Sequence, residues 1–301
     1  MQDFKTKRIE YINNWPNVDK FDIEARYEEK YKSVNNGIPF IPYHMTSNTD
    51  EFYNKAISFL IDALESLGSK PNHSFEFIFT AFDIYSQSVS SIDRITDRNW
   101  SLVPVWNSLI QSNSDLNIAF GKLMENIPHK SLQYIFSRIL DSRIANRSAK
   151  NSNGTVNVNR SNLLNQIKNK YSTNYADYST GIRPGSRLLY HVLNKHSIVI
   201  DGITYSISLE DQLHIIISGF LYSLRNDTAH GSSISTTKSS YSNITTMANS
   251  YFAFLMTYYL LLLLIIDNTS TNKPQALSDL AQNIEVNVNN YILLFGHALS
   301  K

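Results

Sequence analysis

The feature that most constrains this chain is an uninterrupted apolar segment, residues 251–266, with the sequence YFAFLMTYYLLLLLII. A helix of this composition is apolar around its whole circumference, so it has to be covered on all sides. A membrane span requires roughly 18 to 20 apolar residues, and this segment is shorter and lacks flanking Lys or Arg. We therefore expect a helix buried in a protein core or at a dimer interface, with membrane contact as the alternative.

Apolar side chains recur at helical spacing along most of the chain, and Pro and Gly are scarce, with 8 and 10 among 301 residues. In IDRITDR, residues 92–98, the charged residues Asp93, Arg94, Asp97 and Arg98 have the spacing of an exposed helix face. Residues 49–68 should form a helix that buries Phe52, Ala56, Phe59, Ala63 and Leu67. Further helices are predicted near residues 73–90, 114–126, 129–147, 161–171, 184–195, 245–267 and 275–299.

Residues 196–208, HSIVIDGITYSIS, interrupt the helical pattern with two β-branched runs around Asp201-Gly202. An Asp-Gly pair favours the tight turn of a two-stranded hairpin. Directly afterwards, Ser208 and Asp211 have the spacing of a capping box, which marks the start of a helix. The apolar stripe of that helix would consist of Leu209, Leu213, Ile216, Ile217, Phe220 and Leu224.

These patterns predict an all-α, multi-helix bundle with one short β-hairpin insertion. Residues 1–150 would form an N-terminal helical region of unknown role, and residues 151–301 a second helical domain. The chain has no Cys, which excludes disulfides, thiolate nucleophiles and Cys-containing zinc sites. Its first residues lack the apolar core of a secretory signal, and we expect a cytoplasmic protein.

Positive charge is concentrated in residues 143–195, although the formal charge of the whole chain is only +1. This segment contains nine Lys or Arg residues and one acid, Asp177, so its charge is +8, and tyrosines lie among the bases. Because bases neutralise phosphates and tyrosines stack on unpaired nucleobases, the pattern is typical of a single-stranded RNA path. The alternative is a solvated, flexible linker. The RNA-binding candidates are Arg143, Arg147, Lys168, Lys170, Arg183 and Arg187.

A second polar motif, YSLRNDTAHGSS, residues 222–233, stands between two strongly apolar segments. Arg225 offers a fixed fork of donors for phosphate oxygens, and His230 can transfer a proton near neutral pH. Together they suffice for cleaving RNA without a metal ion. In an unbroken helix the two side chains would lie about 140° apart. The cap and turn residues between and after them favour a helix break that would bring both into one cleft.

An Arg followed by a polar residue, and then by His after four to six positions, resembles the signature of the HEPN superfamily. The resemblance covers about residues 184–301 and depends on RNDTAHG, residues 225–231. HEPN proteins are all-helical, usually dimerise so that two motifs face one cleft, and are often metal-independent endoribonucleases of toxin–antitoxin and antiviral defence systems. The resemblance implies that Arg225 and His230 are catalytic and that Asn226 orients them.

The resulting expectation is a HEPN-type endoribonuclease that cleaves single-stranded or loop RNA by attack of the 2′-hydroxyl. We expect no metal or other cofactor and no membrane contact. The expected partners are RNA, a second copy of the chain with a paired active site, and an antitoxin or defence-complex protein. One alternative is a catalytically inactive HEPN-like subunit that binds RNA, a nucleotide or a protein, docking through its apolar helix 245–267. For the motif itself, the alternative is that Asn226 or Asp227 caps a helix, Arg225 pairs with Asp227, and His230 fills a polar corner.

Overall fold

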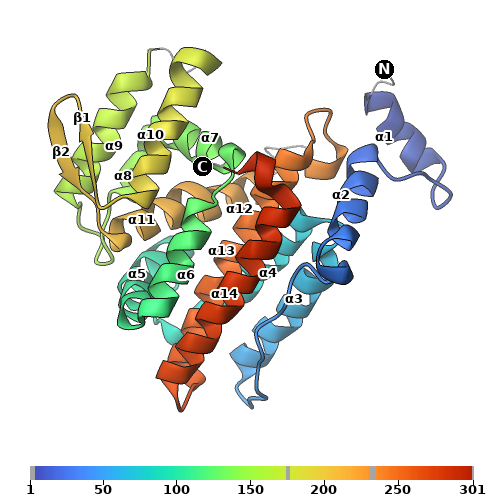
Figure 1. Ribbon diagram of the computed structural model, residues 1–301, viewed down its shortest axis with the longest axis horizontal. Helices are drawn as coiled ribbons and strands as arrows, with labels where there is room; N and C mark the ends of the chain where they lie inside the picture. Colours follow the sequence, from blue (N-terminus) through green and yellow to red (C-terminus); the bar gives the residue numbers. More distant parts are fainter. Residues whose placement is uncertain (1–3, 174–176, 231–234, 300–301) are drawn as a thin grey trace.

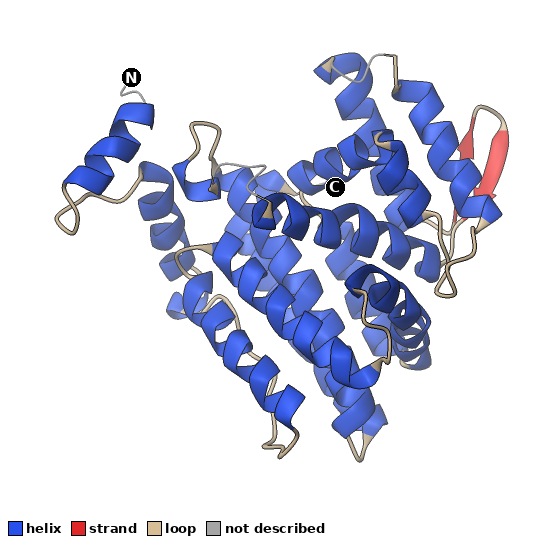
Figure 2. Ribbon diagram, turned by 180° about the vertical axis from the view of Figure 1, so that it is seen from behind, coloured by secondary structure: helices blue, strands red, loops and turns tan. Residues whose placement is uncertain are grey.

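The described chain is mostly helical, as the periodicity predicted, and contains one two-stranded hairpin (Figures 1 and 2). The computed structural model describes residues 4–173, 177–230 and 235–299. The strands are β1 (Ser197–Ile200) and β2 (Ile203–Ser206). The α-helices are α1 (Phe4–Asn13), α2 (Asp22–Ser33), α3 (Glu51–Leu67), α4 (Pro71–Val89), α5 (Ile95–Ser112), α6 (Ser114–Glu125), α7 (His129–Leu140), α8 (Ser142–Ser148), α9 (Val158–Tyr171), α10 (Arg183–Asn194), α11 (Leu209–Ile215), α12 (Tyr222–Ala229), α13 (Ile244–Thr269) and α14 (Lys273–Phe295).

Helix α13 contains the apolar segment and lies within a bundle in which α4, α5, α7 and α14 pack against it. Every side chain from Met247 to Ile266 is buried. Among the described residues, α13 is the one helix with the length and hydropathy of a membrane span, and 94% of its apolar window is buried inside the protein. The predicted burial is confirmed, and the helix offers no apolar face on which a partner could dock.

Helix α3 lies along α4 and begins where the sequence indicated, since the Asp50 side chain accepts the Tyr53 backbone N–H at 2.7 Å. Its buried face was predicted only in part. Ala56, Ala63 and Leu67 are buried, but Phe52 is 37% exposed, and Tyr53 and Leu60 turn inward instead. The buried face of the helix is therefore rotated relative to the predicted face, which was based on Phe52 and Phe59.

Most of helix α5 was not predicted, and the exposed helix face expected in residues 92–98 is found only in part: Asp93 and Arg94 are exposed, whereas Arg98 in the first turns of α5 is not. Arg98 is 2% exposed. Its guanidinium pairs with Asp83 and donates to Ser86 Oγ at 2.9 Å and to the Ile92 carbonyl at 2.8 Å. A guanidinium whose donors meet several acceptors can be buried, and the charge pattern alone did not reveal this.

The hairpin lies at one edge of the molecule beside α9, and α1 lies at the opposite edge (Figure 1). Asp201 and Gly202 have positive φ angles of 50° and 82°, as the predicted tight turn requires. Helix α10, which precedes the hairpin, packs closely on α7 at Gly185. A Cβ atom at this position would lie only 2.3 Å from Phe136 Cζ, so only glycine allows the two helices to come this close. This close packing joins α10 of the basic segment to α7, which in turn packs on the helical segment that leads to the motif.

One hydrophobic core extends across residue 150, where the sequence suggested a domain boundary. Helix α13 packs on α4, and α14 packs on α6, so elements from both predicted regions contribute to the same core. Residue 150 lies between α8 and α9, and the predicted helix 129–147 is divided into α7 and α8 at Asp141.

Candidate functional site

The motif lies at the end of a long helical segment that begins after Ser208. Ser208 Oγ accepts the Asp211 backbone N–H at 3.1 Å, and the Asp211 carboxylate accepts the Ser208 N–H at 2.9 Å, which confirms the capping box. The segment continues through α11, a π-helical part at Ile216–Leu221 (η3) and α12. All residues of η3 are buried, so α12 extends from a helix that the core holds firmly.

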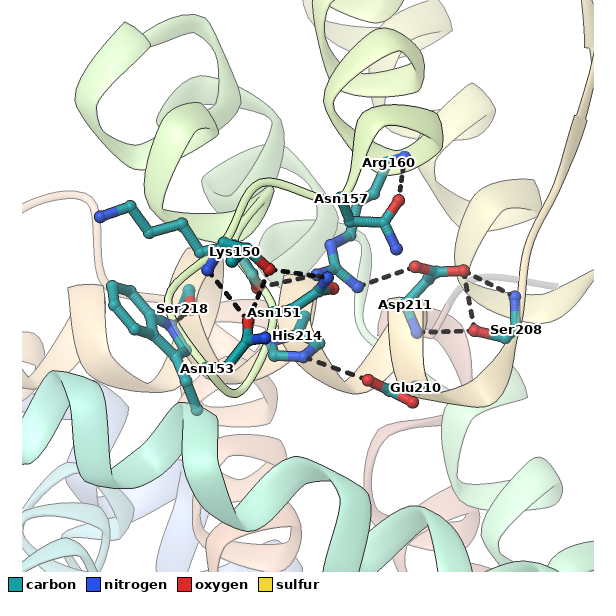
Figure 3. A network of polar contacts seen from close by, with 12 residues as sticks. Lys150, Asn151, Asn153, Asn157, Arg160, Ser208, Glu210, Asp211, His214 and Ser218 are labelled. Carbon is teal, nitrogen blue, oxygen red and sulfur yellow. Dashed lines mark hydrogen bonds and ion pairs between the residues drawn. The ribbon is translucent and has the colours of Figure 1, made fainter. Parts of the chain in front are cut away.

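A buried ion pair holds the first turn of this segment (Figure 3). Arg160 of α9 is 1% exposed, and its guanidinium donates to Asp211 Oδ1 at 2.7 Å. It also donates to the Lys150 carbonyl at 2.7 Å and to Asn151 Oδ1 at 3.1 Å, which ties the loop before α9 to α11. Arg160 contributes to the charge of segment 143–195, but its burial makes it a structural cation rather than an RNA ligand.

His214, one helical turn after Asp211, is fully buried. Burial, with a smaller contribution from the Arg160 guanidinium, lowers the pKa of its imidazole to about 3. Glu210 Oε1 lies 3.8 Å from His214 Nε2, which is too far for a hydrogen bond. The imidazole is therefore neutral at physiological pH and is not suited to proton transfer there.

The helix end expected between Arg225 and His230 is present, but it comes directly before His230, so the turns that separate the two residues are helical. The helix ends at Ala229, and the His230 backbone N–H still donates to the Asn226 carbonyl at 3.0 Å. At helical spacing, the side chains of Arg225 and His230 leave the axis about 140° apart, whereas Asn226 and His230 are only about 40° apart. Arg225 Nη1 donates to Asn226 Oδ1 at 3.3 Å. Asn226 thus links the guanidinium to the helix face from which His230 extends.

Asp227 fixes the motif helix against α7. Its carboxylate accepts the Tyr134 hydroxyl at 2.8 Å and forms an ion pair with Arg138. The Arg138 Cζ atom lies 4.9 Å from the centroid of the Tyr134 ring, and burial raises the pKa of the Tyr134 hydroxyl. Asp227 is therefore engaged with α7 rather than with Arg225, and it lies within α12 instead of capping it. His230, in contrast, is exposed.

The structure brings one RNA-binding candidate directly to the motif helix. The Cζ atom of Arg147 in α8 lies 4.9 Å from the centroid of the Tyr222 ring, one turn before Arg225. Arg143 also belongs to α8, but its side chain lies outside the described part of the chain. Arg183 and Arg187 are on α10, which packs on α7. Arg183 is close enough to His129 to lower the pKa of that imidazole, in addition to the larger effect of burial.

The remaining candidates lie away from the motif, at the last turn of α9. Lys168 and Lys170 both belong to this turn. Lys170 Nζ lies 2.5 Å from Asp201 Oδ1 in the hairpin turn, so its charge is already paired. The basic segment thus combines structural cations with cations near the motif, and it is not a continuous flexible linker.

Arg138 and Tyr134 were not among the predicted site residues, although both contact Asp227 of the motif. They precede Asp227 by 89 and 93 positions, so no local spacing connects them with it. Arg138 also lies just before the basic segment, which was counted from Arg143. The sequence offered one indication that the two residues act together: their i,i+4 spacing places both side chains on the same face of α7.

Known proteins offer no guide to this site: no family matches the chain, and neither the curated proteins nor the solved structures contain a significant match. Among the described residues, no group of three or more His, Cys, Asp or Glu side chains is placed to hold a metal ion. The arrangement does provide an exposed imidazole at His230, the Arg225 guanidinium that donates to Asn226, and a further arginine, Arg147, on α8. These groups can bind a phosphodiester and transfer a proton.

Proposed function

We propose that the protein is a metal-independent endoribonuclease of the HEPN type, acting in the cytoplasm as a toxin or antiviral-defence effector. The observation that supports this most is the motif on α12, where Asn226 connects the Arg225 guanidinium to the helix face that presents the exposed His230. Arg147, beside Tyr222 on the same helix, adds a cation at which the RNA backbone can bind.

The proposed reaction is a transesterification within the RNA. The 2′-hydroxyl oxygen bonds to the adjacent phosphorus, and the bond between phosphorus and the 5′-oxygen breaks. His230 accepts the 2′-hydroxyl proton or returns a proton to the leaving 5′-oxygen, a contribution of roughly 10²- to 10⁴-fold. Arg225 stabilises the charge that develops on the phosphate, and Asn226 orients the guanidinium. The products are a 2′,3′-cyclic phosphate and a 5′-hydroxyl.

The proposed active form is a homodimer with two paired motifs. Because Arg225 and His230 leave α12 about 140° apart, one helix directs them toward different places. When two α12 helices face each other, the imidazole of one chain can approach the guanidinium of the other. Mixing Arg225→Ala and His230→Ala chains should then restore part of the activity that each variant lacks, since one of the two sites in the mixed dimer keeps both groups. No restoration, with dimers present, would contradict shared sites.

The proposal is tested by incubating the purified protein with structured and single-stranded RNA in excess EDTA. We expect cleavage that EDTA does not inhibit, with products ending in 2′,3′-cyclic phosphate, as identified by mass spectrometry. Loss of cleavage in EDTA, or products with 5′-phosphate ends, would contradict the proposed chemistry.

The second candidate is a catalytically inactive subunit that uses the same surface to bind RNA or a nucleotide, or that joins an antitoxin or defence complex. The different directions in which Arg225 and His230 leave the last turns of α12 favour it. It predicts RNA binding without turnover, which a filter-binding measurement beside the cleavage assay distinguishes. A protein that co-purifies with the chain would identify the complex.

A further inference from the structure

Helix α10 presents a face to solvent that the motif does not use. Four side chains leave this face within about 100° of one another and form the α10 face: Arg183, Arg187, Tyr190 and His191. The two arginines are exposed, and the two rings are half-buried. The remaining side of the helix is buried against the elements that pack on it. The α10 face therefore offers two guanidinium groups and two rings within about two helical turns.

The positive charge of the α10 face is not neutralised by the elements around it. Helices α7 and α9 and strand β1 pack on α10, and none of them contains Asp or Glu. Lys195, directly after the helix, adds a further exposed cation. Within the described part of the chain, Arg183, Arg187 and Lys195 form no ion pair. Arginines and lysines in such surroundings bind phosphate groups well.

Two acids lie near the ends of α10, and both have other contacts. The Asp177 carboxylate accepts the backbone N–H groups of Ser179 at 2.7 Å and of Thr180 at 2.9 Å. Glu125 lies at the end of α6, where its charge adds to the larger effect of burial in raising the pKa of the Tyr190 hydroxyl. Within the described residues, neither carboxylate forms an ion pair with α10. The guanidinium groups therefore remain accessible to an anionic ligand.

The two rings of the α10 face lie next to each other beside the arginines. The centroids of Tyr190 and His191 are 5.7 Å apart, and the Tyr190 hydroxyl donates to the Glu125 carbonyl at 3.3 Å. Burial, followed by the charges of Lys195 and Arg187, lowers the pKa of the His191 imidazole, so the ring is mostly neutral at pH 7. Aromatic rings stack on the faces of unpaired bases, which a duplex does not expose.

The α10 face lies on the opposite side of α7 from the motif. Gly185 of α10 packs on Phe136, whereas Asp227 of the motif pairs with Arg138. Residues two positions apart leave a helix about 160° from each other, so α10 and α12 contact different sides of α7. The α10 face is therefore a separate surface and not an extension of the motif.

A membrane surface is a poor match for this helix. A helix that lies in a membrane interface inserts an apolar face into the lipid. No large apolar side chain of α10 is exposed, and the helix lies entirely within the described part of the chain. Its cations and half-buried rings instead resemble the combination with which proteins bind single strands.

We propose that the α10 face is a binding site for single-stranded RNA, separate from the motif on α12. Arg183 and Arg187 bind backbone phosphates, the rings of Tyr190 and His191 stack on bases, and Lys195 extends the positive surface. The binding itself rests on the contacts of α10 alone. Its consequence for the reaction, a preference for single-stranded over paired substrates, rests on the proposed function.

The test measures binding of a labelled single strand of about 12 nucleotides by fluorescence anisotropy, in EDTA and over a range of salt concentrations. The strand carries 2′-O-methyl groups, so the proposed reaction cannot cleave it. The double variant Arg183→Ala/Arg187→Ala is compared with Lys20→Ala/Lys55→Ala. This control removes the same charge from two side chains that are each 57% exposed on other parts of the surface.

We expect the double arginine variant to bind about tenfold more weakly or worse. The slope of log affinity against log salt concentration should become shallower by about 1.4, because each lost phosphate contact contributes about 0.7. Tyr190→Leu should weaken binding at least about fivefold through lost stacking, whereas Tyr190→Phe, which keeps the ring, should bind like the wild type. The lysine control should also bind like the wild type, and a duplex of the same sequence should bind more weakly than the single strand.

No binding of the single strand by the wild-type protein, unchanged affinity in the double arginine variant, or an equal loss in the lysine control would overturn the proposal. Tighter binding of the duplex would do the same, as would binding to phosphatidylserine vesicles without binding to RNA. On cleavable RNA, the double arginine variant should raise KM about tenfold, with a smaller effect on kcat. If the wild-type protein does not cleave RNA, the proposed function fails, and the affinity for the 2′-O-methyl strand alone decides whether α10 binds RNA.

Discussion

The helical segment that carries the motif is held by an ion pair at each end, and the two pairs have different surroundings. At the α11 end, the Arg160 and Asp211 side chains are 0% and 10% exposed. At the α12 end, the Arg138 and Asp227 side chains are 32% and 21% exposed. A fully buried pair is costly to break, whereas a partly exposed pair costs less. The segment is thus held more firmly at its α11 end than at its α12 end.

The largest effect on stability should come from breaking the buried ion pair between Arg160 and Asp211. Replacing Arg160 with Met leaves the Asp211 carboxylate without its buried cation, and we expect a loss of about 3–5 kcal/mol in the free energy of unfolding. Urea denaturation measures this loss. The matched control is Lys170→Met, because the Lys170 and Asp201 side chains are 36% and 48% exposed. That change should cost about 0–1 kcal/mol. Similar losses in the two variants would remove the contrast between buried and exposed pairs.

An intermediate effect on stability should come from lowering the pH, because His214 is buried at the α11 end of the segment. Its pKa is about 3 in the folded protein, below the value of about 6.5 for an unfolded chain. The unfolded state therefore binds a proton that the folded state excludes, and stability falls by about 1.4 kcal/mol per pH unit below about pH 6.5. Urea midpoints measured from pH 7 to pH 4.5 should show this slope, and His214→Leu should reduce it. An unchanged slope in the variant would show that His214 is not responsible.

The smallest effect on stability should come from the α12 end, where the ion pair is partly exposed. Asp227→Asn keeps the shape of the side chain but removes the charge opposite Arg138, and we expect a loss of about 1 kcal/mol. Exchange of the backbone amides in α12 should nevertheless rise, because the contact that fixes α12 against α7 is weakened. A loss as large as that of Arg160→Met, measured in the same urea experiment, would mean that the two ends are equally rigid.

The sequence predicted local structure well where one signal dominates. The Asp201-Gly202 turn, the Ser208–Asp211 capping box and the burial of residues 251–266 follow from neighbouring residues, and the structure confirms all three. Helix rotation was harder, because α3 contains apolar residues on more than one side and only the packing against α4 selects the buried face.

Contacts between distant residues could not be predicted from one sequence. Arg98 and Arg160 read as surface charges, and only the fold brings the acceptors that allow their burial. Arg138 meets Asp227 across 89 positions, and Lys238 meets Glu24 across 214. The helix end expected inside the motif is present, but it comes directly before His230, and the sequence alone did not show that Arg225 and His230 would still leave the helix in different directions.

The most direct test of the proposed chemistry is the initial rate of RNA cleavage by His230→Ala in excess EDTA. The matched control is His297→Ala, which removes an exposed imidazole near the C-terminal end of the described chain. We expect His230→Ala to lose at least about 100-fold in rate and His297→Ala to cleave like the wild type. Equal rates in the two variants would contradict the account.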